Sequence, residues 1–233
     1  MRTLFVNILS FSLLYFTVVL LDLLAMYIVD LEMIRFITKP LLIVLLIVFY
    51  ASNDKESTSG KFVFLIIALG FFLLANVATL FRTEPMIIMS ASIFFILGKL
   101  FYIFRFANRR DFDIVKFLPF VAFYLLYMFV VLSFILDHLG SYLIPVLLFL
   151  FVSLMAMQFA FLRKDEVSEA SYQLVLFGIF TMLFGDTIRV LDAFYFHWTY
   201  GSLSAMLLYA MSQYLIVMGL VKEKIDLKPL ISE

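Results

Sequence analysis

The stretch MRTLFVNILSFSLLYFTVVLLDLLA, residues 1–25, contains one arginine followed by a long run of apolar residues. A helix needs about 20 mainly apolar residues to cross a bilayer, because the hydrocarbon core is about 30 Å thick and each residue rises about 1.5 Å. The run is longer than the apolar core of a signal peptide, which has about 7–15 residues, and no cleavage site of small residues follows it. We therefore predict that this stretch forms an uncleaved first membrane span.

The composition of the whole chain is typical of a membrane protein. Of its 233 residues, 65% are hydrophobic and 15% are charged, whereas soluble domains are about 45–50% apolar and about 25% charged. The formal net charge is zero, so no basic excess indicates a nucleic-acid partner. The chain has no cysteine, which excludes a disulfide framework, a thiol nucleophile and a thiolate metal site.

Eight stretches are long and apolar enough to cross a membrane. The connections between them are short, so we predict one all-α domain over residues 1–233, a polytopic bundle of eight transmembrane helices. The short alternating segments of a membrane β-barrel are not seen. The predicted spans are 4–25, 33–51, 62–81, 86–106, 114–135, 141–162, 171–192 and 197–221.

The lysines and arginines fall mainly on one side of this arrangement. Arg35, Lys39 and Arg82 lie on the opposite side. Because basic residues are enriched in cytoplasmic loops, both termini are predicted to be cytoplasmic, and we expect an integral protein of a bacterial inner membrane. The residues on the predicted cytoplasmic side are Arg2, Lys55, Lys61, Arg105, Arg109, Arg110, Lys116, Arg163, Lys164, Lys222, Lys224 and Lys228.

Two spans share a similar pattern around a polar residue. Asn76 lies in ALGFFLLANVATLF (68–81) and Asp186 lies in LFGIFTMLFGDTIRVL (176–191). Both lie at similar depth, past the midplane toward the outside, if the spans run outward from the cytoplasm. Lys99 and Gln213 occupy comparable places in the spans that follow. These matches predict a parallel duplication of four plus four spans.

A polar side chain inside a bilayer needs a reason, because a charge at a helix centre costs roughly 2.5–3.5 kcal/mol on insertion scales. Asp186, Arg189 and Asp192 are spaced to share one helix face. Either Arg189 is a local counter-ion at the outer interface, or Asp186, the deepest of the three, is a functional group. The polar residues inside the predicted spans are Asp22, Asn76, Lys99, Gln158, Asp186, Arg189, Asp192 and Gln213.

Two lysines allow alternative interpretations. Lys99 either extends its ammonium toward the cytoplasmic surface or belongs to the site. Lys39 precedes Pro40, which we expect in the first turn of its span, where the missing N–H costs nothing. Lys39 can then face the headgroup layer or a cavity that holds a phosphate.

Sequence motifs of soluble enzymes are missing. The chain contains no Walker A loop, G-x-S-x-G, H-E-x-x-H or G-x-G-x-x-G motif. Its two histidines, His138 and His197, are too few for a histidine metal site. We therefore expect neither a metal nor another cofactor.

Five motifs occur in order along the chain. They are TKPLLIVLL at 38–46, LLANVATLF at 73–81, ILGKLFYIFRF at 96–106, MLFGDTIRVLDAF at 182–194 and YAMSQYLIVMGLV at 209–221. In this order and spacing the chain resembles, over nearly its whole length, the YhhN family of eight-span membrane proteins, which includes the lysoplasmalogenases. Those enzymes cleave the vinyl-ether bond of a lysoplasmalogen, giving a fatty aldehyde and a glycerophospho-base.

The resemblance implies a site, but two positions depart from the family pattern. Family members usually have aspartate where this chain has Asn76 and histidine where it has Lys99. Vinyl-ether hydrolysis needs a general acid, an anion that stabilises an oxocarbenium ion and a positioned water. Asp186 remains as the carboxyl and Asn76 is left to orient water. The resemblance places substrate contacts at Lys39, Lys99, Tyr102, Arg189 and Gln213.

Three hypotheses follow for the function. The first is a lysoplasmalogenase-like hydrolase with a lysophospholipid substrate. The second is a family relative that binds or senses a lysolipid without hydrolysing it, because Asn76 and Lys99 replace the usual residues. The third is a small transporter, indicated only by the intramembrane aspartate and the predicted duplication.

Overall fold

The computed structural model describes residues 7–53, 60–81, 85–107 and 114–223, and every regular element within these ranges is helical. This confirms the all-α prediction. Short helical turns, η1 (Val29–Ile34), η3 (Gly140–Tyr142), η4 (Arg163–Asp165) and η5 (Asp192–Phe196), connect some of the long helices. The long helices are α2 (Ile8–Tyr27), α3 (Arg35–Asn53), α4 (Gly60–Ala78), α5 (Pro85–Phe106), α6 (Ile114–Leu139), α7 (Leu143–Leu162), α8 (Glu169–Leu191) and α9 (Gly201–Val221).

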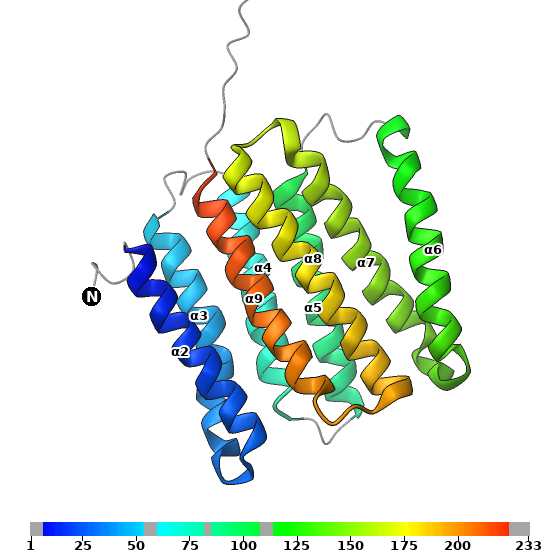
Figure 1. Cartoon of the computed structure of the whole chain (residues 1–233), viewed down its shortest axis with the longest axis horizontal. Coiled ribbons are helices and arrows are strands. Elements are labelled where there is room, and N and C mark those ends of the chain that lie inside the picture. Colours follow the sequence, from blue (N-terminus) through cyan, green and yellow to red (C-terminus); the bar gives the residue numbers. More distant parts are fainter. Residues whose placement is uncertain (1–6, 54–59, 82–84, 108–113, 224–233) are drawn as a thin grey trace, which may run out of the picture.

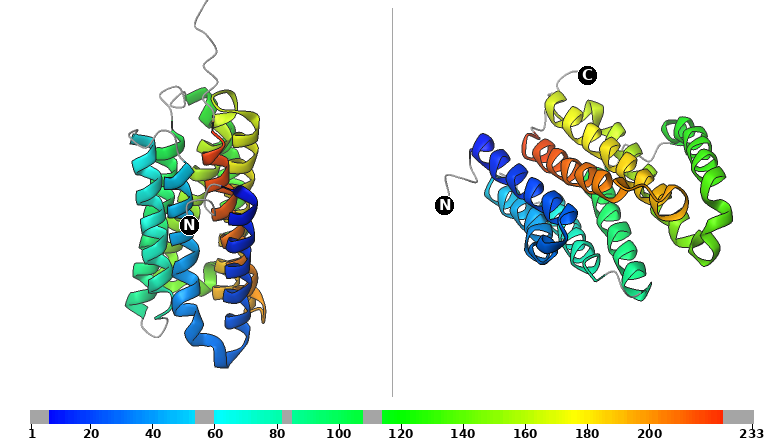
Figure 2. Two further views of the ribbon diagram at one scale, coloured as in Figure 1. Left: turned by 90° about the vertical axis from the view of Figure 1, so that its left-hand side faces the viewer. Right: turned by 60° about the horizontal axis from the view of Figure 1, so that its bottom comes forward.

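Seven helical segments in the described ranges are long and apolar enough to cross a membrane. The number is smaller than the eight predicted spans because one segment, Phe120–Leu162, has 43 residues and covers most of α6 and all of α7. These two helices run back along each other (Figure 1 and Figure 2). The chain reverses at Gly140, whose φ of 48° lies in the left-handed region that favours glycine.

The helices lie roughly side by side, with α2 and α3 at one edge of the bundle and α6 at the other (Figure 1). The start of α2 and the end of α9 lie at the same end, the top in Figure 1, which we call the terminal end. We call the opposite end the cavity end. The contact between α8 and α9 is close because Gly178 and Gly219 have no side chain. A Cβ on Gly178 would lie 2.8 Å from Ile216 Cγ1, and one on Gly219 would lie 2.7 Å from Val175 Cγ2.

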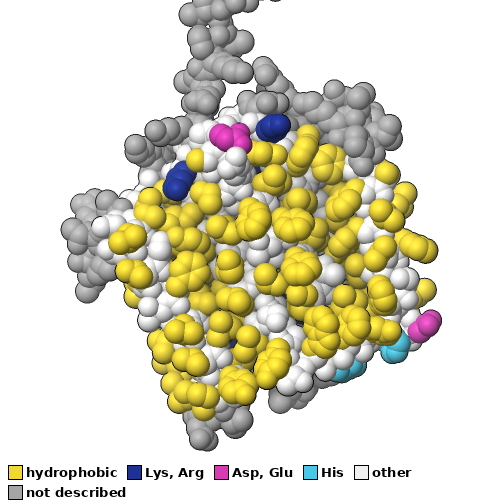
Figure 3. All heavy atoms as spheres, viewed as in Figure 1, with side chains coloured by type: hydrophobic (Ala, Val, Ile, Leu, Met, Phe, Trp, Pro, Cys, Tyr) yellow, Lys and Arg dark blue, Asp and Glu magenta, His cyan; other side chains and the backbone are white. Residues whose placement is uncertain are grey.

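Apolar side chains cover most of the face drawn in Figure 3, and charged side chains appear near its margins. Large apolar residues are exposed on several helices, including Leu13 on α2, Leu125 on α6 and Phe177 on α8. A soluble monomer rarely exposes so continuous an apolar surface. The described part of the chain therefore has the surface of a membrane protein.

Pro40 lies deeper in its helix than predicted. Pro40 lies inside α3 and not in its first turn, because the helix already begins at Arg35. The residues before Pro40 are held by Asp22 of α2. Its Oδ1 accepts a hydrogen bond of 2.7 Å from Thr38 Oγ1 and lies 3.8 Å from Arg35 Nε. This buried polar contact extends the helix toward its N-terminus.

At the terminal end, three residues that we call the Glu223 cluster fasten the last helix. Glu223 Oε2 lies 2.6 Å from the guanidinium of Arg105 and 3.2 Å from that of Arg163. Burial raises the pKa of Glu223, but the two guanidiniums lower it by more than burial raises it. The pKa of Glu223 therefore lies below its ordinary value. The cluster joins the ends of α5 and α7 to the residues just after α9.

Several of the basic residues on which the predicted orientation rests lie outside the described residues. They are Arg2, Lys55, Arg82, Arg109, Arg110, Lys224 and Lys228.

Candidate functional site

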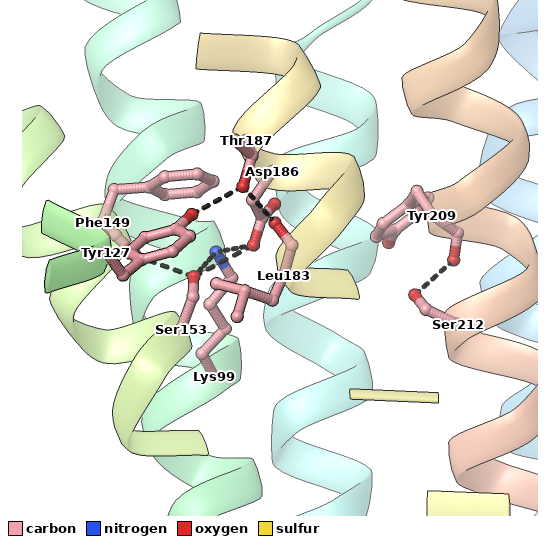
Figure 4. Close-up of polar contacts among 9 residues, drawn as sticks. All are labelled: Lys99, Tyr127, Phe149, Ser153, Leu183, Asp186, Thr187, Tyr209 and Ser212. Atoms are coloured by element: carbon pink, nitrogen blue, oxygen red, sulfur yellow. Dashed lines mark hydrogen bonds and ion pairs between the residues drawn. The ribbon is translucent and has the colours of Figure 1, made fainter. Parts of the chain in front are cut away.

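A buried ion pair joins α5 to α8 in the interior of the bundle. Lys99 Nζ lies 2.7 Å from Asp186 Oδ2, and the two residues are 1% and 7% exposed. Side chains from α5, α7 and α8 converge at this point (Figure 4). The ammonium of Lys99 therefore does not reach toward a surface, because it has a carboxylate partner inside the bundle.

Ser153 of α7 completes this contact. Its hydroxyl accepts a hydrogen bond of 2.8 Å from Lys99 Nζ and lies 3.0 Å from Asp186 Oδ2 and 2.8 Å from the carbonyl oxygen of Phe149. A serine hydroxyl has one proton, so it is shared between the two acceptors. The ammonium also lies 3.3 Å from the ring centroid of Phe149, a cation–π contact. Three helices thus hold the pair in place.

The second predicted catalytic position has different partners. Asn76 of α4 donates from Nδ2 to the hydroxyl of Tyr209 on α9 at 2.9 Å. Its backbone carbonyl accepts from Thr79 Oγ1 at 2.8 Å, and Thr79 Oγ1 in turn accepts from Lys39 Nζ at 2.6 Å. Lys39 and Asn76 are therefore linked through Thr79, while Asp186 belongs to the pair with Lys99.

The three charged residues at the end of α8 and the start of η5 do not form one cluster. Arg189 is half-buried, and its guanidinium carbon lies 5.0 Å from the ring centroid of Phe95 and 5.9 Å from that of Tyr209. Asp192 accepts the backbone N–H of Trp198 at 2.7 Å and fixes the turn that leads into α9. Within the described residues the ion-pair partner of Asp186 is thus Lys99 and not Arg189. A functional role of Asp186 stays a prediction.

A cavity of about 560 Å³ lies at the cavity end of the bundle, within the range of about 300–1,000 Å³ that is usual for ligand sites. Three cations line it, Arg35 and Lys39 from the start of α3 and Arg189 from the end of α8. Asn76 and Phe149 also line it, and most of the remaining wall is apolar. Because the ring of Phe149 contacts Lys99, the buried pair lies one side chain away from the cavity.

Three of the five predicted substrate contacts do not line the cavity. Lys99 pairs with Asp186, and the other two, Tyr102 and Gln213, contact each other. Tyr102 and Gln213 are both 0% exposed, and the Tyr102 hydroxyl donates to Gln213 Oε1 at 2.5 Å. Neither residue lines the cavity. Their hydrogen bond joins α5 to α9, and their role as substrate contacts stays a prediction.

Four residues of the site were not predicted, namely Arg35, Phe149, Ser153 and Tyr209. Tyr209 and Ser153 lie in apolar spans as ordinary packing residues do, and nothing in the sequence indicates which face of their helices points toward the site. Arg35 had a signal, because it is a basic residue on the sparsely charged side of the chain. An arginine at such a position suggests that it has an anionic partner or ligand.

Comparison with known proteins assigns the chain to a protein family. It matches the YhhN family over residues 34–220, a range that includes every candidate site residue from Arg35 to Gln213. No curated protein matches the chain, and no solved structure matches it.

Proposed function

Because the chain belongs to the YhhN family, we propose that it binds a lysophospholipid in the cavity and hydrolyses the vinyl-ether bond of lysoplasmalogens. The products are a long-chain aldehyde and a glycerophospho-base. The observation that carries the proposal is the cavity itself, which combines three cations with apolar walls and is separated by the ring of Phe149 from the buried Lys99–Asp186 pair. An amphiphile with an anionic head and one chain has the matching chemistry.

The phosphate of such a ligand would lie among Arg35, Lys39 and Arg189. Guanidinium and ammonium groups donate charge-assisted hydrogen bonds to phosphate oxygens, and arginine does so in a bidentate fork. The carboxylate that also lines the cavity, Asp192, already accepts the backbone N–H of Trp198. The lining therefore favours an anion.

The chemistry follows from the Lys99–Asp186 pair. Lys99 carries a proton, and Asp186 accepts hydrogen bonds from Lys99 and Ser153. In this scheme the vinyl ether reaches Asp186 past the ring of Phe149, which lines the cavity. A proton passed from Lys99 through Asp186 to the β-carbon of the vinyl ether then produces an oxocarbenium ion, which the carboxylate stabilises. Water adds to the α-carbon and its proton returns to the pair. The resulting hemiacetal decomposes to the aldehyde and the alcohol, so one water is consumed.

Asn76 has a separate role in this scheme. Its Nδ2 is held by Tyr209, which leaves the amide carbonyl as an acceptor that orients the attacking water in the cavity it lines.

The test is aldehyde release by purified protein in bilayers. Wild type is expected to release long-chain aldehyde from a lysoplasmalogen, and Asp186→Asn is expected to release none. Asp137→Asn, which removes an exposed carboxyl on α6, is the matched control and should keep the wild-type rate. Absence of aldehyde with wild type, or equal release by Asp186→Asn, overturns the proposal.

A second candidate function is lipid binding without hydrolysis. The surroundings of Asp186 favour it. Its carboxylate is held by Lys99, and Asn76 stands where the family resemblance leads us to expect a second carboxyl. A variant with Asn76→Asp and Lys99→His tests this candidate. Gain of aldehyde release by that variant, from an inactive wild type that binds lysolipid, would support it.

We also propose that α6 and α7 cross the membrane separately, giving eight spans, both termini in the cytoplasm and one domain over residues 1–233 in a bacterial inner membrane. The reversal at Gly140 and the shared position of the α2 start and the α9 end support an even number of crossings. The four-plus-four duplication remains part of this proposal. Cysteine labels near positions 110 and 164 should react from the cytoplasm only.

A further inference from the structure

The large apolar residues of the exposed cavity wall lie along one side. The large apolar residues that both line the cavity and are exposed are Met89 and Ile93 on α5, Tyr142 on η3, and Ile144 and Leu148 on α7. None of them belongs to α3, α4, α8 or α9 within the described residues. The other exposed lining residues are small, Ala193 of η5 and Ser202 of α9. The apolar side of the opening is therefore formed by α5 and α7.

The opposite wall is basic and closed. Arg35 and Lys39 of α3 are 9% and 5% exposed, and both line the cavity. α3 and α7 lie on different sides of the bundle (Figure 1). The cavity thus has a polar inner end and an apolar opening, with about 560 Å³ between them.

We propose that this opening is a lateral portal, through which a single-chain anionic lipid enters from the membrane between α5 and α7. The phosphate moves to Arg35, Lys39 and Arg189, and the chain lies along Ile93 and Leu148. The inference rests on the proposed lipid binding and adds the route and the direction of the bound molecule.

Two physical reasons favour a lipid over a water-soluble anion. The surfaces of α5 and α7 beside the portal are apolar, with Ile93 at 53% and Leu148 at 50% exposure, so they face hydrocarbon in a bilayer. An ion passing there would lose its hydration at a cost of several kcal/mol. A lysolipid already has its chain at this depth, and its phosphate has to move only a short way to reach the cations.

The experiment uses tryptophan fluorescence, since Trp198 is the one tryptophan of the chain. In a Trp198→Phe background, Ile93→Trp and Leu148→Trp place a probe at the portal. Leu125→Trp on α6 is the matched control, exposed to a similar extent or more and not part of the cavity wall. Each protein in lipid nanodiscs is titrated with a lysophospholipid that has bromine on its chain.

Saturable quenching is expected at positions 93 and 148, and weak, linear quenching at position 125. Adding Arg189→Gln should raise the lysolipid concentration for half-maximal quenching about tenfold, equivalent to about 1.4 kcal/mol. Equal or linear quenching at all three positions overturns the portal. Aldehyde release without saturable quenching overturns the portal and supports hydrolysis. Saturable quenching without aldehyde release supports the portal and overturns hydrolysis.

Discussion

Two regions of the bundle bury charges in different ways. The Lys99–Asp186 pair lies in the interior, with one cation, one carboxylate and the Ser153 hydroxyl, and a single ring separates it from a cavity. The Glu223 cluster lies at the terminal end, with two guanidiniums on one carboxylate. Arg163 also packs over the ring of Phe106, 5.2 Å from its centroid.

The difference indicates different roles. The Glu223 cluster joins the ends of three helices, and its side chains are about as buried as those of the interior pair. None of its three residues lines the cavity, so its role is structural. Burying the interior pair carries a large desolvation free energy, and two apolar residues of similar volume would often give equal stability. A buried pair next to a cavity is therefore better explained by chemistry or binding than by stability alone.

The largest effect is expected from breaking the interior pair on one side. Lys99→Leu leaves the Asp186 carboxylate buried without its cation, and loss of one partner of a buried pair costs about 3–5 kcal/mol. Thermal unfolding in detergent measures this. The double variant Lys99→Leu with Asp186→Leu should recover most of the stability and still release no aldehyde. A double variant as unstable as the single one would contradict this interpretation.

Glu223→Gln should have a smaller effect of about 1.5–3 kcal/mol, the range for hydrogen bonds to charged groups, because the glutamine amide oxygen still accepts hydrogen bonds from the two guanidiniums. The same unfolding measurement checks it. Lysolipid binding and aldehyde release should remain at the wild-type level, since the cluster lies at the end opposite to the cavity. Loss of binding in Glu223→Gln would remove the contrast between the two regions.

The stability that Glu223 contributes should depend on pH. Its pKa in the folded protein is lowered, so its contribution is fully present above the ordinary glutamate pKa of about 4.3 and is lost as pH falls through the folded value. The difference in unfolding temperature between wild type and Glu223→Gln should therefore be constant near neutral pH and shrink in acid. A difference that grows in acid would show the opposite sign of the pKa shift.

Arg189→Gln should weaken the binding of a phosphate-bearing lysolipid about tenfold, or about 1.4 kcal/mol, with little loss of fold stability. The comparison ligand is a monoacylglycerol, which has one chain and no phosphate. Its Kd, measured by the same titration, should not change. Equal weakening for both ligands would mean that Arg189 shapes the cavity and does not contact phosphate.

The smallest effect is expected for Tyr102→Phe, which removes the hydrogen bond to Gln213 between α5 and α9. A net cost of about 1 kcal/mol is typical of one such bond. The unfolding temperature should fall slightly and aldehyde release should stay unchanged. A large loss of activity would return Tyr102 to the site.

The helices could be predicted from sequence with boundaries close to those observed, because apolar length alone identifies a span. The start of α9 was placed at 197 and lies at Gly201. Asp192 holds the turn before it, and its carboxyl leaves no room for a side chain on Gly201. This contact between residues nine positions apart has no signature in hydropathy.

The site was predictable only in part. Asp186, Asn76 and Lys39 stand out because polar residues inside apolar spans need partners, whichever fold they adopt. The pairing of Lys99 with Asp186 joins residues 87 positions apart. It depends on which helices are neighbours and how each is rotated, and neither follows from the periodicity of helices that are apolar nearly all round.

One measurement tests the central claim most directly, the mass-spectrometric analysis of products from a lysoplasmalogen incubated with the protein in nanodiscs. The matched substrate is the analogue with a saturated ether bond, which cannot form the oxocarbenium ion by protonation. Wild type should release long-chain aldehyde from the vinyl ether only, and Asp186→Asn should release none from either. Aldehyde from neither substrate with wild type, or from the vinyl ether with Asp186→Asn, would contradict the assignment.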